Sequence, residues 1–175
     1  MGLFNFFKKS EEENNNPPAS ENERYRLALE EFERNRFKDK EQAKAALQVA
    51  YQFSEGSPLD RHHFYKTAGD YFYNLQHEEG TAALEKCKDI WREHIKYTPD
   101  ILEAYKKKYH KESLLDFIPP DVPAFKRLAE LYEEEGSYSD AVEVCDEALK
   151  YKIRDGTAGG FEGRKKRLQE KMHRR

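Results

Sequence analysis

The stretch from residue 123 to 153 constrains the fold more than any other, because it carries two helical patterns separated by a glycine. In its first half, apolar residues recur at offsets of 0, 3, 4 and 7, the spacing of one face of an α-helix. These residues are Phe125, Leu128, Ala129 and Tyr132. After Gly136 comes a second apolar stripe of Tyr138, Ala141, Val142, Cys145, Ala148 and Leu149. The pattern predicts two short antiparallel helices, the second opening with a capping box of Ser137 and Asp140.

The same spacing recurs twice earlier in the chain. One copy is Tyr65, Ala68, Gly69 and Phe72, followed by Ala83, Cys87, Ile90 and Trp91. The other, 40 residues before it, is Tyr25, Ala28, Leu29 and Phe32, followed by Ala43, Leu47, Ala50 and Tyr51. The copy at 123–153 begins 60 residues after the middle one, which leaves room for an extra helix at 99–113 behind a predicted Thr98 cap. We therefore predict helix pairs near 20–58, 59–97 and 121–153, since one such pair cannot bury both of its faces alone.

This pattern resembles a known repeat family. The residues that carry the likeness to a tetratricopeptide repeat are Phe125, Leu128, Ala129, Tyr132, Gly136, Tyr138, Ala141, Cys145 and Ala148. The resemblance implies an all-α protein built as a short right-handed stack of antiparallel helix pairs, with about eight helices. It also implies a non-catalytic scaffold that binds a protein or peptide segment on the concave face, which the first helix of each pair lines.

We expect three regions along the chain. Residues 1–19 are expected to be disordered, with an apolar peptide followed by a linker rich in Asn and Pro. Residues 20–153 form the predicted repeat domain. Residues 154–175 contain a glycine-rich break at 155–160 and a basic helix expected to cap the stack.

The exposed face of each predicted first helix pairs a cation with an acid four residues later. The cations are Arg26, Lys66 and Lys126, and the acids are Glu30, Asp70 and Glu130. Tyr73, Asn74, Glu133 and Glu134 complete the predicted peptide-binding groove. Family members that grip a C-terminal carboxylate place Asn where these acids stand, so the acids argue against such a clamp and favour a polar or basic peptide. The alternative interpretation is three surface ion pairs between positions i and i+4.

The first nine residues form a candidate docking peptide. Leu3, Phe4, Phe6 and Phe7 lie beside two lysines, a chemistry that suits a hydrophobic groove or, weakly, a membrane surface. This supports an alternative function as a membrane-peripheral or assembly adaptor. A disordered end, or phenylalanines packed on the protein's own body, remains open as the simpler interpretation.

Charge provides a third functional alternative, nucleic-acid binding. Residues 161–175 carry seven Lys or Arg against two Glu, and binding through Arg164–Arg175 would weaken steeply with salt. The net charge of the whole chain is -3, so we expect nucleic acid to be an unlikely partner.

No motif predicts a catalytic residue, a metal or a cofactor. The glycines at 155–160 follow no strand pattern and precede no Gly-Lys-Ser/Thr, so they do not predict a phosphate loop. The six histidines lack the spacing of a helical zinc site. Cys87 and Cys145 occupy equivalent places in two repeats and are predicted to be buried free thiols. With no long apolar run in the chain, we expect a cytoplasmic protein.

Overall fold

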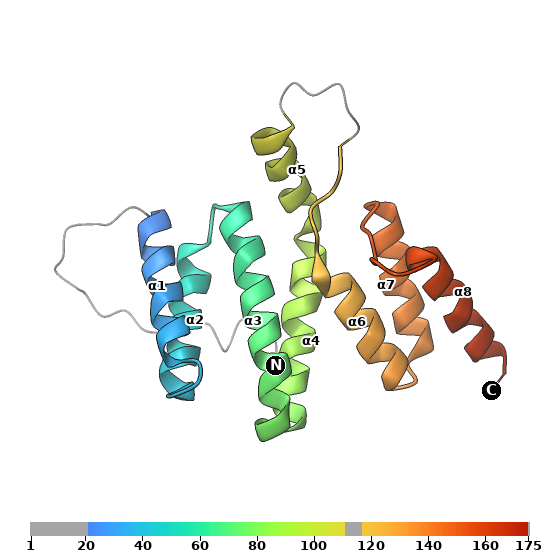
Figure 1. Ribbon diagram of the computed structural model, residues 1–175, viewed down its shortest axis with the longest axis horizontal. Helices are drawn as coiled ribbons and strands as arrows, with labels where there is room; N and C mark the ends of the chain where they lie inside the picture. The colour runs from blue at the N-terminus through green and yellow to red at the C-terminus, as the bar shows by residue number, and fades with distance from the viewer. Residues whose placement is uncertain (1–20, 111–116, 175) are drawn as a thin grey trace. The chain divides into compact units, whose positions relative to one another are not determined.

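The structure of the protein is a computed structural model that describes residues 21–110 and 117–174. In these residues it is entirely helical, with no strand, which confirms the predicted all-α class. The helices are α1 (Glu21–Asn35), α2 (Lys40–Phe53), α3 (Pro58–Glu79), α4 (Thr81–Lys96), α5 (Thr98–Tyr109), α6 (Pro123–Glu134), α7 (Tyr138–Lys150) and α8 (Gly160–His173) (Figure 1). Within this described part, no helix combines the length and apolar character needed to cross a membrane. The predicted docking peptide of Leu3, Phe4, Phe6 and Phe7 lies outside the described residues.

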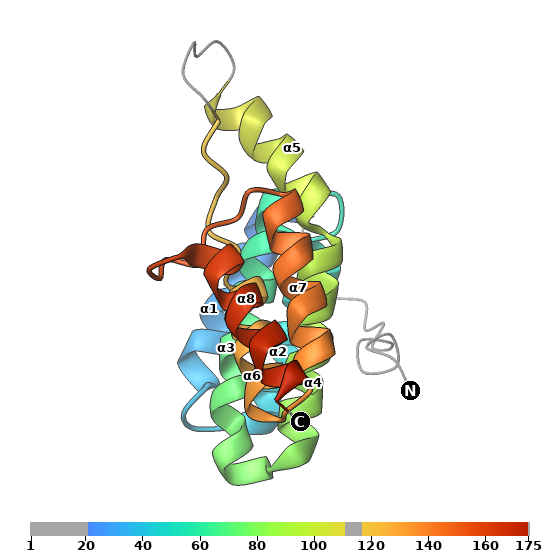
Figure 2. The same ribbon diagram turned by 90° about the vertical axis from the view of Figure 1, so that its right-hand side faces the viewer.

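The chain divides into two compact units, and the boundary between Ile90 and Trp91 falls inside α4. In the first unit, α2 packs against both α1 and α3 (Figure 1). Its largest fully buried side chains are Phe32, Leu47, Phe64 and Ile90. In the second unit, α7 packs against both α6 and α8 (Figure 2). Its largest fully buried side chains include Trp91, Ile101, Phe125, Leu128, Phe161 and Leu168.

Side-chain caps define the helix starts in the first unit. The Asp39 carboxylate accepts a hydrogen bond from the Gln42 amide at 3.0 Å, which fixes the start of α2. Ser57 does the same for α3, where its hydroxyl accepts from the Asp60 amide at 3.4 Å and Pro58 follows as the first helical residue. The start of α3 agrees with the predicted boundary between the pairs at 20–58 and 59–97 to within one residue.

One predicted cap is right in position only, and another is wrong. Ser137 directly precedes α7, as predicted, but with its backbone at φ -80° and ψ 60° the side chain makes no capping hydrogen bond. Thr98 lies inside α5 and does not precede it, since α4 runs almost directly into α5 through a helical Tyr97. The Thr98 hydroxyl therefore donates back to the His94 carbonyl at 3.3 Å, as helical threonines often do.

Helices α6 and α7 end in the same backbone motif. After α6, Gly136 has φ 76° and the Ser137 amide donates to the Tyr132 carbonyl at 2.8 Å. After α7, Lys152 has φ 57° and the Ile153 amide donates to the Ala148 carbonyl at 2.9 Å. Both are Schellman-type ends, in which a left-handed residue reverses the chain. At the end of α6 a glycine adopts the positive φ without strain, whereas at the end of α7 a lysine adopts it.

The two cysteines are free and buried, which confirms that prediction. The Cys87 thiol donates to the Gly69 carbonyl at 3.3 Å and so joins α4 to α3 within the first unit. Burial raises the pKa of Cys145 to about 11, so this thiol stays protonated at neutral pH. Both residues therefore act as small core side chains.

Candidate functional site

The ten residues of the predicted groove are divided between the two units. In the first unit, Arg26 and Glu30 lie on α1, and Lys66, Asp70, Tyr73 and Asn74 lie on α3. In the second unit, Lys126, Glu130, Glu133 and Glu134 all lie on α6. Each set shares one helix or a pair of helices.

Of the three predicted i,i+4 ion pairs, one is present among the described residues. Arg26 pairs with Glu30 on an exposed face of α1. Lys66 and Asp70 form no ion pair with each other, and the Asp70 backbone carbonyl instead accepts a hydrogen bond from the Asn74 amide at 2.8 Å. On α6 the predicted partner of Lys126 is engaged elsewhere.

The acids of α6 pair with cations of α8. Arg164 Nη2 donates to Glu130 Oε1 at 3.2 Å, and Arg164 Nη1 lies 3.5 Å from Glu133 Oε2. Lys171 Nζ donates to Glu133 Oε1 at 2.6 Å. Two members of the predicted groove thus hold the C-terminal helix against α6. Sequence reasoning missed this role, because a cation on a polar helix gives no sign of which acid it will meet.

Arg164 is also the centre of a buried ion pair. Its guanidinium donates to both oxygens of Asp155, at 3.0 Å and 3.2 Å, and the arginine and aspartate residues are only 6% and 4% exposed. Burial alone would raise the pKa of Asp155, but hydrogen bonds from Arg164 and Thr157 outweigh it, so that the pKa is lowered. The glycine-rich break before α8 is therefore tied to that helix by a bidentate ion pair.

A surface pocket of about 320 Å³ lies in the second unit between the end of α4, α6 and α7. We call it the α7 groove. Its lining residues are Arg92, Ile95, Lys96, Leu128, Tyr132, Asp140, Glu143, Val144 and Glu147. Sequence reasoning identified only part of this set: Leu128 and Tyr132 were predicted on the apolar stripe of α6, and Asp140 was predicted in a capping box.

The floor of the α7 groove is apolar and well ordered by packing. The floor consists of the aliphatic side chains of Ile95, Leu128 and Val144, which are buried. Arg92 lies beside the aromatic wall: its Nε donates to the Tyr132 hydroxyl at 2.9 Å, and its guanidinium carbon is 5.7 Å from the ring centre. The hydrogen bond fixes the tyrosine ring, so the floor presents a defined apolar surface.

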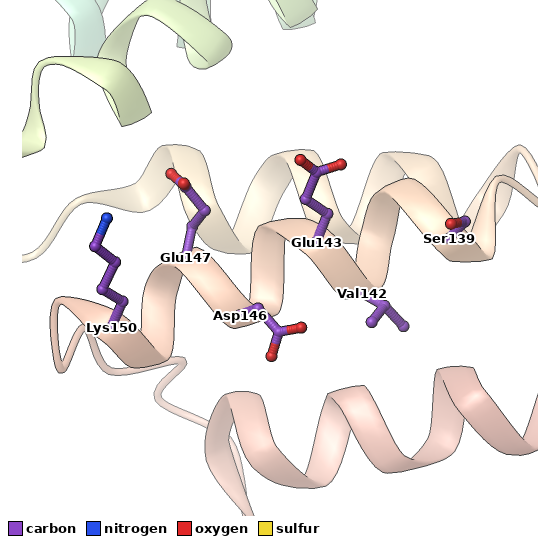
Figure 3. A pocket seen from close by; sticks show the side chains of 6 residues that line it. All are labelled: Ser139, Val142, Glu143, Asp146, Glu147 and Lys150. Carbon is purple, nitrogen blue, oxygen red and sulfur yellow. The ribbon is translucent and has the colours of Figure 1, made fainter.

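The rim that α7 contributes is acidic. Asp140, Glu143 and Glu147 recur at intervals of three and four residues, which places them on one face of the helix. None of the three forms an ion pair with another described residue. Figure 3 shows Glu143 and Glu147 on one side of α7, with Asp146 projecting from the other side. Asp146 accepts a hydrogen bond from Lys165 of α8 at 2.5 Å, so it is neutralised and separate from the rim.

Among residues 21–110 and 117–174, no group of three or more His, Cys, Asp or Glu side chains is placed to hold a metal ion. The α7 groove combines an apolar floor, one fixed aromatic ring and a row of carboxylates.

Comparison of the chain with family models, with curated proteins and with solved structures finds no match.

Proposed function

We propose that the protein is a non-catalytic scaffold that binds a polypeptide segment in the α7 groove. The observation that carries this proposal is the apolar floor of Ile95, Leu128 and Val144 beside a row of carboxylates that have no ion-pair partners among the described residues. A peptide that places an apolar side chain on the floor and a Lys or Arg beside it would match both features. The groove recognises the side chains of such a peptide and has no chemistry to perform on it.

The energetic terms favour a modest affinity. Burying one apolar side chain of a peptide against the floor contributes roughly 1.5 to 3 kcal/mol. Charge complementarity with the rim adds specificity and speeds association, more than it adds affinity. After the entropy cost of ordering the peptide, we expect dissociation constants of roughly micromolar order.

The arrangement of α6 and α7 supports a tetratricopeptide-like scaffold as part of this proposal. Their apolar stripes, the Schellman end at Gly136 and the antiparallel packing are the features on which the resemblance rests. In such a scaffold the predicted groove on the first helices, including Arg26, Lys66 and Lys126, remains a second candidate surface. The adaptor function through residues 1–9 and nucleic-acid binding through Arg164–Arg175 stay predictions.

A random 12-residue peptide library displayed on phage, selected against the full chain, tests the proposal. We expect the enriched peptides to carry an apolar residue next to Lys or Arg. Synthetic versions of these peptides should bind at least tenfold more weakly to the double variant Glu143→Gln/Glu147→Gln, because a matched cation loses its partners.

The control removes two exposed acids of α8 in the same unit, as Glu162→Gln/Glu170→Gln, and should leave peptide binding within about twofold, since exposed distant charges act weakly. The proposal fails if no peptide is enriched, or if both double variants weaken binding equally. If peptide binding is weakened instead by the triple variant Arg26→Ala/Lys66→Ala/Lys126→Ala, the binding site is the predicted groove of the first helices.

A further inference from the structure

A second hollow of about 280 Å³ lies in the second unit, at the start of α6. We call it the cationic hollow, because Lys126 and Arg127 from α6 and Arg154 from the segment after α7 all line it. Asp121 and Asp155 are the acids in its lining. It shares no lining residue with the α7 groove.

The two acids do not balance the three cations. Asp155 is buried and both of its oxygens accept hydrogen bonds from Arg164, a residue outside the lining. Arg164 also pairs with Glu130 and Glu133, so its one positive charge is shared among three acids. Three cations against two acids give the lining of the hollow a net charge of about +1, which attracts anions at close range.

Two of the cations have no competing partner among the described side chains. Lys126 and Arg154 form neither a hydrogen bond nor an ion pair with another side chain in residues 21–110 and 117–174. The charge of Lys126 nevertheless lowers the pKa of Asp155, which lines the same hollow, so the ammonium group lies close to it. Neutralising either cation with a ligand would break no ion pair.

The backbone adds to this positive field. Val122 precedes α6 without making a side-chain cap, and Pro123 occupies the first helical position. The amide groups of the first turn thus keep their positive dipole end unneutralised by a side chain, next to Lys126. The contribution of the helix dipole is small beside the three full charges, but it has the same sign.

We propose that the cationic hollow binds a phosphate group. Three cations from two separate segments, around a space of this size, suit a compact dianion with several oxygens better than a single carboxylate. Arg154 can donate in pairs to phosphate oxygens, and Lys126 supplies a point charge. Free orthophosphate and the phosphate monoester of a modified side chain share this chemistry.

Isothermal titration of the full chain with inorganic phosphate, at constant ionic strength set by chloride, tests the inference. We expect saturable binding with a dissociation constant in the millimolar range or below. The variant Lys126→Gln/Arg154→Gln should weaken phosphate binding at least tenfold while circular dichroism shows an unchanged helix content, because both side chains are partly or fully exposed.

The matched control is Lys166→Gln/Arg167→Gln, which removes two exposed cations from α8 in the same unit. It should leave phosphate binding unchanged. The proposal is overturned if the unmodified chain shows no saturable phosphate binding. It is also overturned if both double variants lose binding equally, because that result indicates general attraction to a basic surface. Competition by N-acetyl-phosphoserine amide assigns the hollow to attached phosphate groups, whereas binding of orthophosphate without such competition assigns it to the free ion. Neither result depends on the α7 groove, so the two proposals fail separately.

Discussion

Replacing Arg164 with Met removes the charge at the centre of the α8 ion-pair cluster while keeping much of the side chain's apolar stem. The change leaves Asp155 buried with a negative charge and takes one partner each from Glu130 and Glu133. Breaking a buried ion pair by removing one partner typically costs about 3 to 5 kcal/mol. The two glutamates are part-exposed, and Glu133 keeps its ion pair with Lys171. We therefore expect the free energy of unfolding to fall by an amount near the lower end of that range, about 3 kcal/mol.

Urea unfolding measures this loss directly. Trp91 is the only tryptophan of the chain and is buried in the second unit, so its fluorescence reports on the unit that contains Arg164. Because the pKa of Asp155 is lowered in the folded state, the stabilisation is present above the unfolded value of 3.8 and is lost as pH falls below it. The comparison therefore belongs at pH 7, where it is complete.

The neighbouring variant Lys165→Met is the control. It breaks a pair with Asp146 in which both side chains are substantially exposed, so it should cost less than about 1 kcal/mol. Adding Asp155→Asn to Arg164→Met should recover part of the loss, because the orphaned charge disappears. Equal costs for the variants at 164 and 165, or no recovery in the double variant, would refute the role assigned to Arg164.

The remaining predictions concern a buried histidine and a strained turn. Burial, with the charges of Lys66 and His63 nearby, lowers the pKa of His62 to about 4, so the unfolded chain binds a proton first as pH falls. The unfolding free energy should drop by up to about 3 kcal/mol between pH 6.5 and 4. Replacing His62 with Gln should flatten that slope when urea unfolding is repeated over this pH range. Lys152→Gly should raise the stability by roughly 0.5 to 1 kcal/mol, since glycine adopts the left-handed end of α7 without strain. A lowered melting temperature for that variant would contradict the assignment.

The helices could be predicted from the sequence because their signals are local. Apolar spacing located every pair, and Gly136 marked the end of α6. The side-chain caps expected at Ser137 and Thr98 are absent, although Ser137 does precede its helix, because capping depends on a backbone conformation that the preceding residues influence. At Thr98 the preceding helix had not stopped.

The candidate sites were harder to predict, since they depend on which helix faces meet. Glu130 and Glu133 were predicted to lie on an exposed face of α6, but both pair with cations of α8, Arg164 and Lys171, and these pairs join residues more than thirty positions apart. The acids of the α7 groove carry no mark that separates them from other helical glutamates. Only their position beside Leu128 and Tyr132 distinguishes them from those glutamates.

The order in which the chain is synthesised gives the Arg164 cluster a further consequence. The ribosome delivers Glu130, Glu133 and Asp155 before the arginine that neutralises them. A nascent chain that has extended only through Asp155 therefore holds three unmatched carboxylates, and it also lacks Phe161, whose ring lies 6.4 Å from that of Phe125. The first unit meets no such delay, because its residues precede this segment entirely. Its folding can proceed during translation, while the second unit completes its core after α8 has emerged.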